Sequence, residues 1–395
     1  MPPLVHRCWP VLLSLILVGC DRGGESSAPP PPELASPEPK TTLGPPDPAL
    51  EQATTAAWAL GETWLRDTNT LCDAFHSVLQ TLLEAPDEQR LTDARSHWHQ
   101  CHNRWHRLTP LLTLGESNPG LFADLNQIRF LIDAHPLQPG YLDGLEQYPY
   151  SGIVNDITLP INAATLREQH GLTDDADVVL GLHALEFLLW GETGTRTADD
   201  FIYQREVQDE QREAELSEAQ LPRNRRRELT RLISQLLQDD LNALEQRWQA
   251  TNLRPTATYH HLHPASRLPL LREALIMLLG NRLPDALAQQ ETSEQAHNRF
   301  AGRNEQPVLA ALSGTDQLLS TGNPTLLSQL LSPADQDAWQ QAWQPINNAL
   351  TAANDTAGTE WPSSLPVLAD LLTPSDPLST PTLDTTEHLE PIEQQ

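Results

Sequence analysis

The chain has 395 residues, of which 53 are acidic and 25 basic, so its formal net charge at pH 7 is −28. A field of that sign repels nucleic acid, and no basic stripe offsets it, so we expect no nucleic-acid partner. Lysine occurs once, at Lys40, which excludes a Walker A lysine, a pyridoxal-phosphate Schiff base and a serine–lysine dyad. No Gly-x-Gly-x-x-Gly follows a strand-like run, which argues against a Rossmann dinucleotide site.

Residues 1–19 are predicted to be a secretory signal peptide, since the apolar run 8–18 is too short to span a bilayer. This run ends in Leu17-Val18-Gly19-Cys20, which resembles a bacterial lipobox, where cleavage precedes a cysteine that is then lipidated. We therefore expect a protein anchored to the membrane through Cys20 and facing the periplasm of a bacterial cell envelope. The choice between inner and outer membrane stays open. The alternative is an ordinary signal peptide with a chance cysteine, or no signal.

Composition divides the rest of the chain into a linker, two helical bundles and a tail. Residues 20–48 are predicted to be a linker, because they are rich in proline and have no apolar face to bury. Helical periodicity then runs almost throughout, which predicts an all-α fold of two packed antiparallel bundles. We place the N-terminal bundle at 49–204 and the C-terminal bundle at 205–373, followed by a disordered tail at 374–395.

Several later segments carry an apolar stripe at helical spacing. The clearest of these is 223–249. Shorter helices are predicted near 266–280, 284–299, 306–321, 333–352 and 362–372.

Cys72 and Cys101 lie in the apolar seams of two predicted helices, 65–82 and 91–112. A turn at Ala85-Pro86-Asp87 separates these helices, and the two cysteines are at nearly equal distances from it. Residues equidistant from the turn of an antiparallel hairpin lie level, so we predict a disulfide between them, as in an oxidising compartment. The alternative is a pair of buried free thiols.

Residues 173–191 predict a helix with Thr173 or Asp174 as its cap and Gly191 as its end. Its residues are apolar on nearly every side, which is typical of a buried helix.

This apolar helix nevertheless carries His183 and Glu186, which are three residues apart and so share one face. A buried carboxylate without partners costs on the order of several kcal/mol. The two side chains must therefore meet each other, other polar groups, water or a metal. Gly181, one turn earlier, lets another segment approach closely.

The segment Gly181-Leu182-His183-Ala184-Leu185-Glu186 resembles the G-x-H-x-x-E signature of the imelysin family of bacterial envelope proteins. Ile132-Asp133-Ala134-His135-Pro136-Leu137 resembles another imelysin segment, and 225–248 resembles its later long helix, so the resemblance covers about residues 55–345. It implies an all-helical fold of two bundles with the His/Glu motif near their junction. The family was named for a peptidase activity, and related proteins include periplasmic iron-uptake components.

The chain departs from the family pattern at five positions. His135 stands where tryptophan is common, and His102 and Thr109 stand where arginine and glutamate are expected. Ala296 and Asn298 stand where glutamate and serine are usual. If these positions support the site, this member is altered or inert.

The His183 and Glu186 pair lacks the second histidine of the zincin motif H-E-x-x-H. It is more similar to the His and Glu pairs that bundle helices contribute to iron centres. We predict that both residues bind a divalent metal, iron or zinc, or orient its ligands. Sequence physics alone favours a buried hydrogen-bonded pair with no metal.

His99, His102 and His106 form a stripe on the predicted helix 91–112. Three neutral imidazoles on one face can hold zinc, copper or nickel, which makes these residues weaker candidates for a metal site. The plainer interpretation is a solvated or half-buried flank. The loop cluster 259–263 contains further histidines and has the same two interpretations.

Together these patterns predict a lipid-anchored periplasmic protein that acts as a metal-related binding or uptake accessory, with an envelope protein as its candidate partner. Catalytic residues are not assigned. Two alternatives remain open. One is a metallopeptidase in which Glu186 is a ligand or base and a metal-bound water is the nucleophile. The other is a structural, partner-binding lipoprotein in which the pair only stabilises the core.

Overall fold

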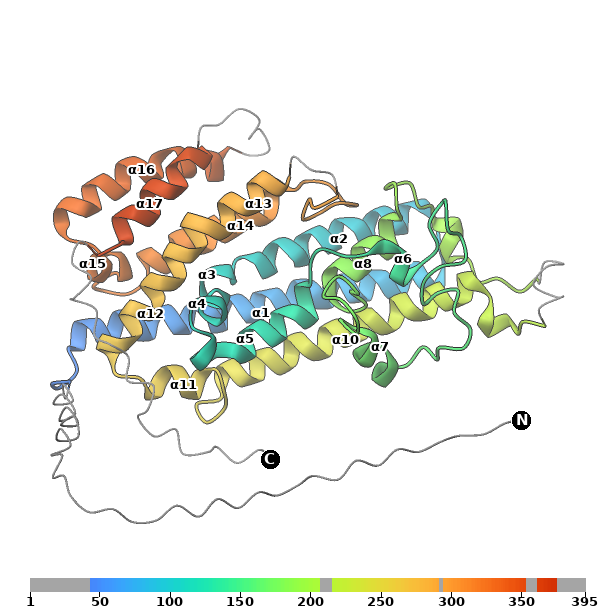
Figure 1. Ribbon diagram of the computed structural model, residues 1–395, viewed down its shortest axis with the longest axis horizontal. Coiled ribbons are helices and arrows are strands. Elements are labelled where there is room, and N and C mark those ends of the chain that lie inside the picture. Colours follow the sequence, from blue (N-terminus) through green and yellow to red (C-terminus); the bar gives the residue numbers. More distant parts are fainter. Residues whose placement is uncertain (1–42, 207–214, 291–293, 353–360, 375–395) are drawn as a thin grey trace, which may run out of the picture. The chain divides into compact units, whose positions relative to one another are not determined.

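Two long helices, α1 (Pro48–Glu84) and α10 (Pro222–Gln249), pack along each other, and shorter helices cover them (Figure 1). The computed structural model describes residues 43–206, 215–290, 294–352 and 361–374. Within these ranges the regular structure is helical and contains no strand, as the predicted all-α class requires. No helix in these ranges is long and apolar enough to cross a membrane.

Several predictions fall on residues that are not described. The signal peptide over 1–19, Cys20, and nearly all of the predicted linker and tail lie outside the described ranges. The predicted bundle boundary between 204 and 205 stays a prediction. In the described part, α10 packs against α1, α5 and α8.

The predicted hairpin is formed by α1 and α2 (Glu88–His106). Asp87 begins α2, because its carboxylate accepts a hydrogen bond from the backbone N–H of Arg90 at 2.8 Å. Cys72 and Cys101 form a disulfide between the two helices, which confirms the predicted pairing.

The second helix of the hairpin ends at His106, whereas the sequence pattern predicted it to continue to residue 112. Pro110 has no backbone N–H to donate to the carbonyl oxygen of His106, so the helical ladder breaks there. The hydroxyl of Thr109 donates to that carbonyl instead, at 2.7 Å. Three further helices follow: α3 (Thr109–Leu112), α4 (Leu114–Ser117) and α5 (Pro119–Asp133).

The apolar helix α8 (Gly181–Trp190) begins later than predicted. Neither Thr173 nor Asp174 caps it. Their backbone N–H groups donate to the carboxylate of Asp177 at 3.2 Å each, so these polar residues close a turn of their own. The predicted end is confirmed, since Gly191 terminates the helix with φ +73°. Two short helices precede α8: α6 (Pro139–Leu142) and α7 (Ala163–Gln169).

The C-terminal part contains another group of helices, of which α16 and α17 lie over the others at one end of the molecule (Figure 1). The predicted helix over 284–299 is wrong in its second half, because the helix ends at Gln289 and residues 294–304 form irregular chain. The bounds are α11 (Thr256–His261), α12 (Pro264–Met277), a π-helical turn (Leu278–Arg282), α13 (Leu283–Gln289), α14 (Glu305–Ser320), α15 (Leu326–Leu330), α16 (Pro333–Thr351) and α17 (Ser364–Leu372). Short 3-10 turns span Ala198–Phe201, Glu218–Gln220 and Trp361–Ser363.

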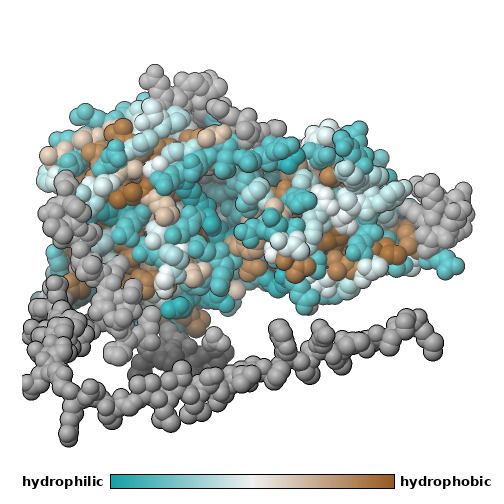
Figure 2. Space-filling view, viewed as in Figure 1, coloured by the Kyte–Doolittle hydropathy of each residue, from teal (hydrophilic) through white to brown (hydrophobic). Residues whose placement is uncertain are grey.

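A continuous apolar core joins these helices. Trp58 of α1 stacks on Trp248 of α10 at 4.2 Å and on Tyr259 of α11 at 4.3 Å between ring centroids. Hydrophilic residues dominate the face of the molecule shown in Figure 2. The buried histidines and carboxylates described next are therefore exceptions to an otherwise ordinary division between core and surface.

Candidate metal centre

Histidine and acidic side chains from four separate segments meet inside the fold. His102 comes from α2, Asp133 from the last residue of α5, His183 from α8 and His297 from the irregular segment 294–304. One ligand-type atom from each of these four residues lies within 4.8 Å of the others. Because the segments are far apart in the chain, only the tertiary fold brings the four side chains together.

Asp133 is at the middle of this group. Its Oδ1 lies 3.2 Å from Nε2 of His183, 3.6 Å from Nε2 of His102 and 3.9 Å from Nε2 of His297. His106 adds a further imidazole, whose Nε2 lies 3.5 Å from Asp133 Oδ2. The same nitrogen is 3.1 Å from Nε2 of His102 and 3.0 Å from Nε2 of His297. Ligands about 2.0–2.2 Å from one ion lie at such separations from each other.

The group is largely buried, and some of its polar atoms have no hydrogen-bond partner. His102 is 0% exposed and His183 is 1% exposed. Oδ1 of Asp133 and Nε2 of His183 are buried and make no hydrogen bond, although they face each other at 3.2 Å. Nearly all buried polar groups in proteins are hydrogen-bonded, so unpaired atoms of this kind need an explanation. A proton on Nε2 of His183 or a cation between the two atoms satisfies both, and the donor set therefore fits a metal.

The pKa values of several of these side chains are shifted in the direction that favours the metal-binding form. Burial lowers the pKa of His102, and it holds the pKa values of His106 and His297 well below the usual 6.5. These imidazoles are therefore neutral at neutral pH and offer lone pairs. Burial acts to raise the pKa of Asp133, but the surrounding imidazoles outweigh it and hold that pKa well below 3.8. The carboxylate is therefore ionised.

His183 has the opposite shift. Burial acts to lower its pKa, but Asp133 and Glu186 together outweigh burial and raise it to about 9. Its imidazole is therefore protonated in the metal-free protein. A cation bound at Nε2 would displace that proton.

Glu186 has a different role from the other residues, because both of its oxygens are occupied. Oε2 accepts a hydrogen bond from Nδ1 of His183 at 2.8 Å. Oε1 accepts from the backbone N–H groups of Phe300 and Ala301 at 2.9 and 2.8 Å. Glu186 thus orients His183 so that its Nε2 faces Asp133. It also fixes the segment 294–304, which carries His297, through the two backbone hydrogen bonds. This is the arrangement of a residue that orients metal ligands from outside the coordination sphere.

A glycine allows the helices to approach closely at the centre. Gly181 has φ +81°, and a Cβ atom there would lie 2.3 Å from the carbonyl oxygen of Ile132. Only glycine accepts both the left-handed backbone and this contact. Trp98 links α2 to α8. Its indole N–H donates to the carbonyl of Leu182 in α8 at 2.9 Å, and its ring stacks on His102 of α2 at 4.5 Å between centroids.

The other histidines named from the sequence lie in different places in the structure. His99 is buried between the rings of Trp98 and Trp190, at 5.2 and 5.5 Å between centroids, and does not belong to the group. The interpretation of the stripe as a solvated or half-buried flank is wrong, because His102 and His106 are fully buried. The cluster 259–263 is not the predicted loop throughout, because its first three residues lie in α11. His263 caps α12 by accepting from the N–H of Ala265.

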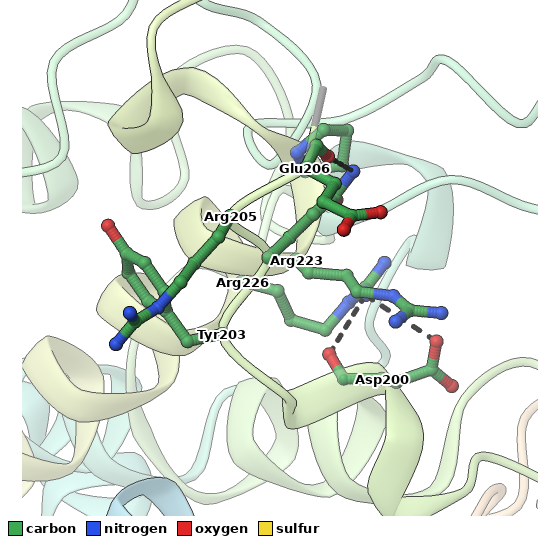
Figure 3. A pocket seen from close by; sticks show the side chains of 8 residues that line it. Asp200, Tyr203, Arg205, Glu206, Arg223 and Arg226 are labelled. Carbon is green, nitrogen blue, oxygen red and sulfur yellow. Dashed lines mark hydrogen bonds and ion pairs between the residues drawn. The ribbon is translucent and has the colours of Figure 1, made fainter. Parts of the chain in front are cut away.

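A small cavity lies beside the centre. Its volume is about 10 Å³, and its lining includes His135, His183, Glu186 and His297 but not His102 or Asp133. That is room for about one water-sized group. A larger pocket of about 630 Å³ lies at the start of α10. None of the centre's residues lines this larger pocket, where Arg226 pairs with Asp200 at 3.7 Å (Figure 3).

The family model described as Imelysin matches residues 63–374. The chain belongs to the imelysin family. Solved structures share the fold of this imelysin chain, among them the two given next, and no curated protein matches it. An imelysin-like protein from Psychrobacter arcticum has 15% sequence identity and a TM-score of 0.50, with 84% of this chain and 93% of that chain covered. A protein described as an iron-regulated protein A precursor from Parabacteroides distasonis has 12% identity and a TM-score of 0.56, with 84% and 94% covered.

Two of the five positions noted from the sequence lie at or beside the centre. His102 belongs to the group of ligand-type residues, and Nε2 of His135 lies 3.2 Å from the carbonyl oxygen of Ala296. His102 therefore supplies a donor to the group.

Sequence reasoning did not identify Asp133 or His297 as ligands in this imelysin chain. The only available signal for Asp133 was an acidic residue at the end of an apolar helix, in a segment quoted for its resemblance alone. His297 gave no signal, because its segment was predicted to be helical.

Proposed function

We propose that this chain is a metal-binding protein of the bacterial cell envelope, lipid-anchored through Cys20 and facing the periplasm, which serves as a binding or uptake accessory. One observation carries the metal-binding part. Three imidazoles and one carboxylate from four segments converge in a buried group, and two of their facing atoms have no hydrogen-bond partner. His183 would be a ligand, whereas Glu186 would orient it.

Two features support the proposed location. The residues Leu17-Val18-Gly19-Cys20 resemble a lipobox, and the disulfide between Cys72 and Cys101 suits an oxidising compartment. One structural relative is described as iron-regulated, which makes iron one candidate cargo beside zinc. The partner in this proposal is another protein of the envelope.

The size of the centre favours an ion over a polypeptide substrate. A peptidase must admit a peptide bond to its metal, yet the cavity beside the centre is about 10 Å³ and is lined by buried side chains such as His183 and Glu186. A bound metal in this proposal supplies charge and coordination to the ligands. We assign no hydrolytic step.

Zinc binding tests the proposal. The full chain is purified in detergent, stripped of metal with a chelator and titrated with Zn²⁺, and bound metal and melting temperature are measured together. We expect about one equivalent of zinc and a rise in melting temperature, because an ion that binds only the folded state stabilises it. Iron and copper salts are titrated in the same way.

Two variants of the same helix provide the comparison. His102→Ala removes a member of the group, whereas His97→Ala removes a histidine whose Nδ1 faces the carbonyl of Asp93. The first should weaken zinc binding by at least about tenfold and the second should not. If the wild type retains none of these metals, the proposal is wrong.

The anchor has its own test. Wild type should fractionate with membranes and into detergent, whereas Cys20→Ser should be released as a water-soluble protein. Equal fractionation of the two would remove lipidation at Cys20 from the proposal.

A further inference from the structure

We infer that the centre selects a divalent, nitrogen-preferring cation, Zn²⁺ or Cu²⁺, over Fe³⁺, Ca²⁺ and Mg²⁺. This inference rests on the proposed function, because it states which class of ion the same group of residues holds. Three observations support it: the chemical type of the donors, the buried charge around them and the size of the cavity.

Nitrogen dominates the donor set. Nε2 atoms of His102, His106, His183 and His297 surround a single carboxylate, that of Asp133. Imidazole suits zinc, copper, iron and nickel, whereas carboxylate, carbonyl and water suit magnesium, calcium and manganese. Calcium takes about six to eight oxygen ligands. Asp133 is the only carboxylate in the group.

Glu186 does not add oxygen ligands to this count. One of its oxygens is held by the imidazole of His183, and the other by two backbone N–H groups. Recruiting Glu186 as a ligand would break these hydrogen bonds and leave buried N–H groups unpaired, which is unfavourable. The centre therefore remains rich in nitrogen when an ion binds.

The buried charge matches a divalent ion. Asp133 and Glu186 are the two carboxylates that contact His183, and a doubly charged cation matches their two formal charges. A trivalent ion would leave one uncompensated positive charge in a buried place, which is costly.

The surrounding charges do not supply the missing negative charge. Arg282 lies near Asp133, and it shares Glu116 with Arg129, so this neighbouring cluster is itself positive. At the cavity rim, the acidic Glu294 is accompanied by the basic Arg299. Neither the arginine cluster nor the charges at the rim supply the extra negative charge that Fe³⁺ would need.

The cavity also excludes the forms in which ferric iron is usually carried. Ferric iron in neutral solution is bound to hydroxide or to oxygen chelators such as citrate, and these accompany it as ligands. The cavity beside the centre, about 10 Å³ and lined by His135, His183 and His297, has no room for a chelator. Only a bare ion that exchanges its water ligands for imidazoles can be accommodated.

Direct competition tests the inference. Full-length, metal-stripped protein is dialysed against equal concentrations of Zn²⁺ and ferric citrate, then against Zn²⁺ with excess Ca²⁺, and bound metals are measured by elemental analysis. We expect zinc to bind at least roughly tenfold more tightly than either competitor. Added Co²⁺, used as a spectroscopic probe, should give the ligand-field bands of a nitrogen-rich site.

A substitution at His297 can change the ligand atom from nitrogen to oxygen and still leave a ligand there. His297→Asp replaces one imidazole by a carboxylate on the irregular segment, where the side chain is 19% exposed and a change is tolerated best. The ratio of zinc to ferric affinity should fall by about tenfold. His97→Asp adds the same charge to α2 outside the group and should leave the ratio unchanged.

The outcomes separate the inference from the proposed function. If the wild type retains ferric iron as well as or better than zinc, the selectivity is wrong, although metal binding stands. If it retains none of the cations, the proposed function itself fails. An unchanged affinity ratio in folded His297→Asp would also overturn the role of the imidazoles in selection. The wild-type competition decides the question even if that variant does not fold.

Discussion

Gly181 lies so close to Ile132 that a Cβ atom at the glycine would be 2.3 Å from the carbonyl oxygen of the isoleucine. This contact places the first turn of α8 against the last turn of α5. Ile132 immediately precedes Asp133, and Gly181 lies two residues before His183. One backbone contact therefore determines the 3.2 Å separation between the two facing atoms of the centre.

Replacing Gly181 by alanine should disturb both the fold and the centre. The φ of +81° disfavours any side chain, and the added carbon clashes with backbone that cannot move cheaply. We expect Gly181→Ala to lower the free energy of unfolding by more than about 2 kcal/mol and to weaken zinc binding. Urea denaturation and zinc titration measure the two effects.

Gly120 provides the matched control for this variant. It lies in the first turn of α5, and a Cβ atom there would meet nothing within 4 Å. Gly120→Ala should leave zinc affinity unchanged and stability within about 1 kcal/mol of the wild type. Equal effects of the two substitutions would show that the contact with Ile132 does not matter.

Glu186 should act through His183 and the segment 294–304, and not as a ligand. In Glu186→Gln one side-chain oxygen can still accept from the N–H groups of Phe300 and Ala301, so the fold should persist. Zinc affinity should fall by about 10–100-fold, as for other residues that orient a ligand.

Glu186→Ala should in addition destabilise the protein by about 2–4 kcal/mol, because it leaves buried N–H groups without an acceptor. Thermal melting without metal separates this effect from the loss of binding. Complete loss of zinc binding in a folded Glu186→Gln protein, equal to that in His183→Ala, would make Glu186 a ligand and contradict our assignment.

Sequence alone identified the part of the centre that breaks a local pattern. His183 and Glu186 stood out as polar residues on an apolar helix, and His102 and His106 as a stripe beside an apolar seam. The same local reasoning located the hairpin and the Cys72 to Cys101 disulfide, because register within one hairpin follows from distance to its turn.

The rest of the centre depends on contacts between distant segments. Asp133 ends an ordinary helix, and nothing nearby in the sequence shows that α2 and α8 meet there. His297 lies in irregular chain held by Glu186, a contact across 114 residues to Phe300. Periodicity reports which residues share a face, but not which faces meet. The late start of α8 was missed for a similar reason, since Asp177 competes for the N–H groups that a helix start would use.

A second buried charge group should govern stability in acid. Asp143 is 1% exposed and pairs with Arg226 at 2.6 Å and Arg196 at 3.0 Å. Burial acts to raise its pKa, but the two guanidinium groups outweigh burial and keep that pKa below 3.8. A carboxyl whose pKa is lower in the folded state stabilises the protein above its unfolded-state pKa. That contribution is lost as pH falls through the folded-state pKa.

Asp143→Asn should therefore be destabilised at pH 7 by about 3–5 kcal/mol, because Arg196 and Arg226, both largely buried, each lose a charged partner. The difference from wild type should shrink as pH falls below about 4. Urea unfolding from pH 7 to pH 2.5 measures both curves. Asp239→Asn, at an exposed position of α10, is the control. A constant difference across this range would show that Asp143 does not supply the acid dependence.

The disulfide should contribute to stability without shaping the centre. It closes a loop with a sequence separation of 29, which in the chain-entropy account stabilises the fold by about 3–4 kcal/mol. Because this effect acts mainly on the unfolded state, a Cys72→Ala, Cys101→Ala double variant should melt at a lower temperature yet bind zinc within about threefold of wild type. A reductant should lower the melting temperature of the wild type and leave that of the variant unchanged. A large loss of zinc affinity would instead show that the bond holds the adjacent His102 in place.

His99 and His106 offer the sharpest comparison within one helix, because both are buried and only one faces the group. Nε2 of His106 lies 3.1 Å from His102 and 3.0 Å from His297, whereas His99 packs between two tryptophan rings. His106→Ala should weaken zinc binding by more than about tenfold. His99→Ala should cost about 1–3 kcal/mol of stability through lost packing and leave the zinc affinity within about twofold. Calorimetric titration and melting of both variants measure these effects. If zinc binding were weakened in His99→Ala but normal in His106→Ala, the ion would have to bind on the His99 side of α2. That result would contradict a metal site around Asp133.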